Sequence, residues 1–172
     1  MNALEDYCKQ CQREGSLNNT SPQKMKIGRF KGEKWWIVYD QSSQKIVSAA
    51  GTHPLPQIGI DTWRIMHRLA TLRDFRAKAG PIGSDQRSCF GWGRLLPYQV
   101  AYCKIQGARK IVFTTNADEK GDPNSLRQNR VCELVFEKKG MAKKIATTVL
   151  FGVTQNIWQV GIQDVYSKKS IS

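Results

Sequence analysis

One stretch, residues 62–116, limits the fold more than any other part of this chain of 172 residues. Residues 62–72 mix β-branched, aromatic and long side chains without glycine or proline, which predicts a strand. A polar loop over 73–93 leads into a predicted helix, Leu95–Gln106, and Ile111–Thr115 is typical of a buried strand. A strand, a helix and a strand joined by a short return turn predict two parallel strands with a right-handed crossover. The stretch therefore predicts an α/β fold with a mixed sheet.

The ends of the predicted helix are set by proline and glycine. Pro97 fits a helix only within its first turn, so we expect the helix to begin near Arg94. Gly107 stands where a C-terminal cap belongs. The helix is therefore short and follows directly on a glycine-rich loop.

That loop and the helix start predict an anion-binding site. Gly91 and Gly93 precede the expected N-terminus, where free backbone N–H groups and the helix dipole attract negative charge. Arg87 and Arg94 lie beside them. The arrangement suits a cofactor that carries phosphate, and the alternative is a glycine-rich basic connector with no ligand.

Three segments resemble the GNAT superfamily of acyl-CoA N-acyltransferases. Residues 69–76, Leu-Ala-Thr-Leu-Arg-Asp-Phe-Arg, resemble the end of that family's fourth strand, which runs into its pyrophosphate loop. Residues 107–116 resemble its helix exit and fifth strand, and Ser125–Lys139, closed by Gly140, resembles its fourth helix. The resemblance covers residues 20–165, and the order of elements is its strongest part. It implies one GNAT-like domain over 1–172, in which a central parallel strand pair splays around a cofactor cleft and helices flank the sheet.

The sequence departs from the family at two places. Arg76 falls on the Gln or Arg of the pyrophosphate loop, but Ala79 and Pro81 stand where glycines belong. Phe136 falls on the tyrosine that commonly protonates the leaving thiolate in the family, and phenylalanine has no proton to give. The resemblance thus implies acyl-CoA binding more strongly than acid catalysis.

The resemblance implies acetyl transfer from acetyl-CoA, or another acyl-CoA, to an amine that the sequence does not identify. Backbone groups of the central strand would meet the thioester, and the loop and helix start would meet the pyrophosphate. The expected cofactor-binding residues are Leu69, Ala70, Thr71, Leu72, Arg76, Arg87, Gly91, Trp92, Gly93, Arg94, Asn116 and Arg127. No metal ligand set is expected.

Two residues are candidates for catalysis. His67 lies on the predicted central strand and could act as a general base, and the alternative is a partly buried structural histidine. Ser125, at the start of the predicted fourth helix, could assist departure of the thiolate. His53, which we place in a loop before Pro54, is expected to have no special role.

The charge of the chain leaves a second function open. Lys and Arg number 27 against 14 Asp and Glu, a formal net charge of +13. Positive potential attracts polyanions, which include coenzyme A and nucleic acids. The alternative function is a catalytically degenerate GNAT-fold module that binds nucleic acid or a protein partner. Without an apolar run of transmembrane length or a visible signal peptide, a cytoplasmic protein with no membrane partner is expected.

Five cysteines include the pair Cys8 and Cys11, spaced as C-x-x-C. Together with Leu4 and Tyr7 they fall on one face of a predicted helix, so we interpret them as packing residues. The other predicted elements are helices over 2–14 and 21–27, a hairpin of strands 34–39 and 45–50, a loop over 51–59, a final strand pair over 145–153 and 157–165, and a flexible tail over 166–172.

Overall fold

The computed structural model describes residues 2–16, 21–28, 30–75, 90–117, 129, 132–138 and 140–161. Six strands form one mixed sheet in the order β1-β2-β3-β4-β6-β5. Neighbouring strands are antiparallel except β3 and β4, which are parallel as predicted. The strands are β1 Lys34–Asp40, β2 Lys45–Pro54, β3 Thr62–Thr71, β4 Lys110–Asn116, β5 Ala142–Leu150 and β6 Val153–Val160.

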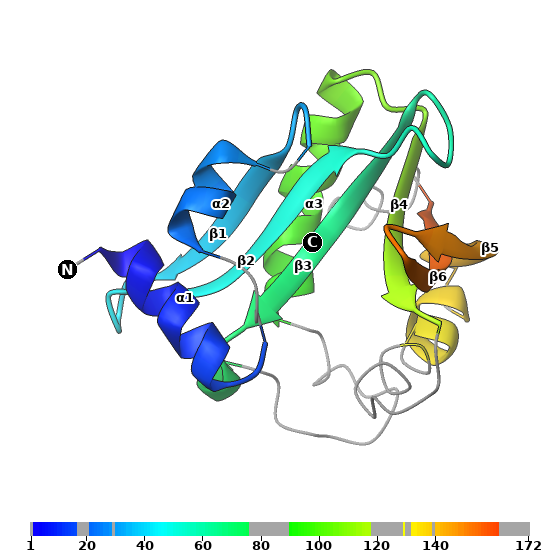
Figure 1. The fold of residues 1–172 in the computed structure, drawn as a ribbon. Coiled ribbons are helices and arrows are strands. Elements are labelled where there is room, and N and C mark those ends of the chain that lie inside the picture. The colour runs from blue at the N-terminus through cyan, green and yellow to red at the C-terminus, as the bar shows by residue number, and fades with distance from the viewer. Residues whose placement is uncertain are drawn as a thin grey trace, which may run out of the picture.

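Helices cover both faces of this sheet. Helix α3 (Phe90–Ile105) lies on one face, while α1 (Ala3–Arg13) and α2 (Pro22–Ile27) lie on the other (Figure 1). Val100 of α3 packs with Ile65, Ile111 and Phe113 in the larger core cluster. A smaller cluster joins α1 and α2 to β2 and the end of β3. The layered mixed sheet confirms the predicted fold class.

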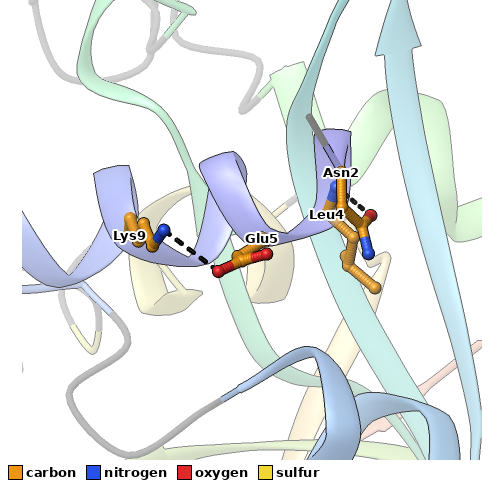
Figure 2. A network of polar contacts seen from close by, with 4 residues as sticks. All are labelled: Asn2, Leu4, Glu5 and Lys9. Atoms are coloured by element: carbon orange, nitrogen blue, oxygen red, sulfur yellow. Dashed lines mark hydrogen bonds and ion pairs between the residues drawn. The ribbon is translucent and has the colours of Figure 1, made fainter.

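Helix α1 begins and packs as its sequence predicts. Asn2 caps its N-terminus, because the side-chain Oδ1 accepts a hydrogen bond from the Leu4 N–H at 3.2 Å (Figure 2). On the exposed side, Lys9 Nζ lies 3.0 Å from Glu5 Oε1 one helical turn away (Figure 2). On the buried side, Cys8 and Cys11 are 2% and 0% exposed and pack in the smaller cluster. Burial raises the pKa of the Cys8 thiol.

Strand β2 is longer than predicted, because Gly51 is not a turn residue. The strand continues through Gly51 to Pro54, so His53 lies in the sheet and the predicted loop over 51–59 is wrong in its first half. A Cβ atom at position 51 would lie 3.3 Å from His67 Cδ2 and 3.3 Å from Trp35 Cε2. Gly51 thus leaves room over β2 for the rings of Trp35 from β1 and His67 from β3.

The last hairpin turns earlier than predicted. β5 ends at Leu150 and β6 begins at Val153, whereas the sequence analysis placed strands over 145–153 and 157–165. Phe151 and Gly152 both have positive φ, 53° and 80°, which is the conformation of a two-residue hairpin turn. Because apolar residues flank Gly152, the sequence pattern predicted a continuous strand there instead of a turn.

Helix α3 also begins earlier than predicted, at Phe90 rather than near Arg94. Pro97 therefore lies inside the helix, where it leaves the Gly93 carbonyl without its usual intrahelical donor. Gly107, with φ 82°, caps the C-terminus as predicted. The segment predicted as the fourth helix has a π-helical turn, η3 (Cys132–Glu137), before Gly140.

In the described part of the chain, no helix is both long enough and apolar enough to cross a membrane. The predicted tail over 166–172 lies outside the described residues.

Candidate functional site

The parallel strands β3 and β4 pair over a short stretch and then separate. Three residue pairs are in register, and the last of them is Arg64 with Val112. β3 continues to Thr71 and β4 to Asn116, and their C-terminal ends lie apart (Figure 1). Within the described ranges, no pairing joins the two strands past Arg64 and Val112. Backbone groups on the facing edges beyond that point are therefore not used by the sheet.

Strand β3 is irregular where this separation begins. Met66 and Arg68 have positive φ, 54° and 52°, and the register with β2 shifts twice between Ala49 and His53. The Gln99 side chain, which is fully buried, accepts from the Met66 N–H at 2.9 Å and donates to the Ala50 carbonyl at 3.3 Å. Gln99 thus satisfies backbone groups that the bulge exposes. Sequence reasoning missed this residue, although a glutamine on the apolar face of a helix was the available signal.

The end of β3 directs alternate N–H groups to opposite sides. The Leu72 N–H donates to the Val47 carbonyl of β2 at 2.9 Å. Because the Ala70 carbonyl and the Leu72 N–H both face β2, the Thr71 N–H between them points away from β2, toward the side of β4. The sequence analysis expected backbone groups of Leu69, Ala70, Thr71 and Leu72 at the thioester, and of these the Leu72 N–H is used within the sheet.

Hydrogen bonds and side-chain packing hold the end of β3 against α1 and β2. The Ala70 carbonyl accepts hydrogen bonds from the Tyr7 hydroxyl at 2.8 Å and from Ser48 Oγ at 3.1 Å. Ser48 Oγ also lies 2.9 Å from Thr71 Oγ1. Leu69 packs against the larger core cluster, while Ala70 and Leu72 are buried in the smaller one. Burial raises the pKa of Tyr7, so its hydroxyl stays protonated and keeps donating.

The N-terminus of α3 contains the predicted glycine pair in a different place. Gly91 and Gly93 lie within the first turn of the helix, together with Trp92, instead of in a loop before it. A Cβ atom at Gly93 would meet nothing within 4 Å among the described residues. Arg94 is exposed in the same turn. The first turn therefore has N–H groups without acceptors inside the helix, one turn earlier than expected.

A polar network holds the end of β4. The Thr115 hydroxyl receives a hydrogen bond from Trp158 Nε1 at 2.9 Å and donates to Asn129 Oδ1. Asn129 Nδ2 donates to the Asn116 carbonyl at 2.6 Å, and Asn156 Nδ2 donates to Asn129 Oδ1 at 3.2 Å. The predicted residue Asn116 therefore contributes its backbone to a fixed strand end, while its side chain is exposed.

His53 on β2 and His67 on β3 contact each other on the face of the sheet opposite α3. The rings of His53 and His67 lie 4.9 Å apart, edge to face, and both side chains are buried. Phe30 stacks on His53 at 4.0 Å and contacts Phe151 of the β5–β6 turn at 5.1 Å. The expectation that His53 is a loop residue is wrong, because β2 continues through it.

Burial sets the protonation state of His53. Its Nδ1 lies 2.7 Å from the Pro54 carbonyl, and its Nε2 is buried without a hydrogen-bond partner among the described residues. Desolvation lowers its pKa to about 4, and the charge of Arg64 acts in the same direction. His53 is therefore neutral near pH 7, with Nδ1 as donor to the carbonyl.

Arg64, at the last paired position of β3, is 9% exposed on the same face. Its Nη2 donates to Thr114 Oγ1 and, at 3.4 Å, to Gln155 Oε1, while its Nε is buried without a partner in the described part of the chain. Burial and then the charge of Arg68 lower its pKa to about 10, so it remains cationic at neutral pH. The sequence analysis counted this residue only within the net positive charge of the chain.

Four predicted site residues, Ser125, Arg76, Arg87 and Arg127, lie outside the described residues. Phe136, which occupies the family's tyrosine position, is half-buried and contacts Phe113 edge to face at 5.7 Å. Phe113 belongs to β4 just after its last pair with β3. The Phe136 ring thus lies beside the separated part of β4.

No protein-family model and no curated protein matches the sequence. Solved structures do match it. A protein assigned to the GNAT acetyltransferases in Desulfovibrio desulfuricans is 16% identical, with 94% of this chain and 96% of that chain covered and a TM-score of 0.52. BjaI, a CoA-dependent acyl-homoserine lactone synthase solved with SAM and isopentyl-CoA, is 12% identical, with 95% of this chain and 77% of that chain covered and a TM-score of 0.50. The chain therefore has the fold of the GNAT acyl-CoA N-acyltransferases.

Proposed function

We propose that this protein transfers an acyl group, acetyl in the simplest case, from a coenzyme A thioester to an amine. The observation that carries the proposal is the separation of β3 from β4 past Arg64 and Val112, beside the N-terminus of α3. Such an opening offers unpaired strand backbone to an extended ligand, and the helix start offers N–H groups to its phosphates. The matched structure that was solved with isopentyl-CoA supports a CoA thioester as the donor.

In this proposal the backbone of β3 polarises the thioester. The Thr71 N–H, on the side of β3 away from β2, and the backbone of Leu69 beside it would donate to the carbonyl oxygen as it gains negative charge. The hydrogen bonds from Tyr7 and Ser48 to the Ala70 carbonyl hold this short segment in place. Preorganised donors of this kind lower the barrier because they do not have to reorient during the reaction.

The remaining roles are those that the sequence resemblance implies. Arg94, Gly91, Trp92 and Gly93 would meet the pyrophosphate at the start of α3, and Arg76, Arg87 and Arg127 are proposed to add charge. His67, whose two ring nitrogens are buried, is proposed to take up the amine proton through water, and Ser125 is proposed to assist departure of the thiolate. Holding the amine and the thioester together supplies a large part of the rate by itself.

A test of the function measures binding and turnover separately. Calorimetry with acetyl-CoA and with longer acyl-CoA thioesters should show saturable binding, and thiol release should accelerate with at least one amine of a panel of amino acids, polyamines, aminoglycosides and peptide N-termini. A protein that binds no acyl-CoA, and that duplex DNA or RNA stabilises against heat instead, would be the basic binding module and not an acyltransferase.

Removal of the Arg94 charge should weaken cofactor binding. An exposed guanidinium at the helix start would make one charge-assisted contact with the pyrophosphate, so Arg94→Ala should raise the Kd for acetyl-CoA about tenfold. The effect should shrink in high salt, because added ions screen exposed charges. Calorimetry at two salt concentrations measures both quantities.

Arg109→Ala is the matched control for this prediction. Arg109 follows α3 at its other end, its side chain is 87% exposed, and it pairs with Asp61 at 3.4 Å. The control removes the same charge far from the helix start, so it should leave the Kd within about twofold of wild type, as expected for a screened distant charge. Equal losses in the two variants would mean that net charge, and not a contact at the start of α3, determines affinity.

A further inference from the structure

Strand β3 has one extra residue at each of two places where it pairs with β2. At the first place, Ala50 of β2 lies opposite residues 68 and 69, and at the second, Thr52 lies opposite residues 65 and 66. Each of these two β-bulges contains a residue with positive φ, Arg68 in one and Met66 in the other. Side chains other than glycine rarely adopt this conformation, which persists only where the surrounding structure fixes it.

The side chain of Gln99 connects the two bulges from α3. Its Oε1 accepts from the Met66 N–H in one bulge at 2.9 Å, and its Nε2 donates to the Ala50 carbonyl at the other at 3.3 Å. Gln99 is fully buried, while the other buried side chains in the described part of α3 are those of Leu95, Val100 and Cys103. A primary amide offers one acceptor and two donors without a charge, so it satisfies both backbone groups inside an otherwise apolar face.

The bulges determine which way the end of β3 faces. Successive residues of a strand direct their N–H groups to opposite edges, so the loss of one bulge would shift β3 by one residue and reverse every orientation beyond it. With both bulges in place, the Leu72 N–H donates to the Val47 carbonyl on the β2 side at 2.9 Å. The Thr71 N–H therefore lies on the side of β4.

We propose that Gln99 is a positioning residue, which holds both bulges and thereby directs the Thr71 N–H, instead of the Leu72 N–H, toward β4. Its bond to the β2 carbonyl lies one residue from the pair that Ala49 forms with Ala70. The anchor is thus next to the segment whose orientation it sets. Without it, two buried backbone groups would lose their partner, and a slipped strand with a regular ladder would become the more favourable arrangement.

Gln99 also joins the two ends of the candidate cofactor site. It follows Arg94 by five residues, or about 7.5 Å along α3, and it contacts β3 at the bulge. Under the proposed function, on which the catalytic part of this inference rests, the start of α3 meets the pyrophosphate and the end of β3 meets the thioester. A rigid connection between the two elements would keep the reacting carbonyl at its hydrogen-bond donor.

Hydrogen exchange followed by NMR tests the positioning without turnover. Gln99→Met keeps much of the volume and removes both hydrogen bonds. The reference is the Leu55 N–H, which donates to the Thr62 carbonyl at the other end of the β2–β3 pair, before the bulges. In Gln99→Met, exchange of the Leu72 N–H should accelerate at least about tenfold more than exchange of the Leu55 N–H, because a local slip exposes one and not the other.

The matched control is Val100→Ala. Val100 is fully buried beside Gln99 on α3, and its side chain has no polar group. The substitution should lower the melting temperature by about 5 °C through lost packing, and it should accelerate exchange of both amides alike. It therefore separates a general loss of stability from a change at the end of β3.

Single-turnover thiol release gives the second readout. Gln99→Met should slow the chemical step about a hundredfold, the effect of losing one preorganised donor. Its Kd for acetyl-CoA should stay within about threefold of wild type, because a donor that acts mainly in the transition state affects the rate more than binding. Val100→Ala should keep both quantities within about threefold, since it leaves the bulges in place.

Gln99→Glu provides a rescue that depends on pH. A protonated carboxyl donates and accepts as the amide does, and burial raises the pKa of a carboxyl. The rate of this variant divided by the wild-type rate should therefore be highest in mild acid. It should fall as the pH rises from about 6 to about 9, because the ionised carboxylate cannot donate to the Ala50 carbonyl.

Equal acceleration of Leu72 and Leu55 exchange in Gln99→Met would overturn the proposal, and so would a wild-type rate in that variant or a rate ratio for Gln99→Glu that does not change with pH. If Gln99→Met does not fold, the rate ratio and the exchange of the same two amides in Gln99→Glu at both pH values decide the question. A wild type that acylates no amine would refute the proposed function, and hydrogen exchange would still show whether Gln99 positions the end of β3.

Discussion

Phe136→Tyr should raise the rate of acyl transfer about a hundredfold, the usual contribution of a positioned general acid. The Phe136 ring contacts Phe113 on the separated part of β4, where the thiolate of coenzyme A would leave under the proposed function. The ring is half-buried, and the prediction requires that its outer edge faces the opening. Single-turnover thiol release with a saturating amine measures the chemical step.

Two controls separate acid catalysis from a packing effect. Phe136→Leu removes the aromatic contact without adding an acid and should not exceed the wild-type rate. The gain in the tyrosine variant should also disappear at high pH, where a phenol ionises and has no proton to give. A tyrosine variant that folds, binds acyl-CoA and reacts no faster than wild type would show that the ring lies away from the leaving sulfur.

Stability should fall in mild acid because of His53. Burial lowers the pKa of His53 from 6.5 to about 4, so the folded protein resists a proton that the unfolded chain accepts below pH 6.5. The stabilisation is therefore complete above pH 6.5 and is lost as the pH falls toward 4. Linkage gives a loss of about 2 kcal/mol in the free energy of unfolding between pH 7.5 and pH 5, where most ordinary carboxylates are still ionised.

His53→Gln isolates this contribution. Glutamine does not titrate, and its amide can donate to a carbonyl as His53 Nδ1 does to that of Pro54. Urea unfolding at pH 7.5 and pH 5 should therefore show a smaller difference in the variant than in the wild type, by about 2 kcal/mol on the same linkage argument. Parallel pH curves for the two proteins would mean that His53 is protonated or exposed in the folded state.

Much of the element order could be predicted from the sequence, because local chemistry decides it. Asn2 and Ser21 cap the helices that they precede, and Gly107 ends α3, since these residue types satisfy helix ends wherever they occur. The parallel pair β3 and β4 followed from the spacing of strand, helix and strand. The packing side of α1 followed from helical periodicity, which places Tyr7, Cys8 and Cys11 on one face.

The predicted ends of helices and strands were wrong at residues whose role depends on neighbours that are distant in the sequence. Gly51 looks like a turn residue in sequence, but in the sheet it makes room for Trp35 and His67, which lie on other strands. Pro97 looks like a helix start, but α3 continues through it. Gly152 was hidden in an apolar run, although it forms the turn between β5 and β6.

The sequence by itself determined that this chain forms a mixed α/β sheet with a parallel pair at its centre, because hydrophobic period, caps and connection length act locally. Tertiary structure alone decided which polar groups meet. It brought His53 to His67, placed Gln99 under the bulge at Met66, and buried Arg64 between neutral partners. The physical reason is that burial and hydrogen bonding depend on contacts between different strands, and no local pattern records which side chains those contacts bring together.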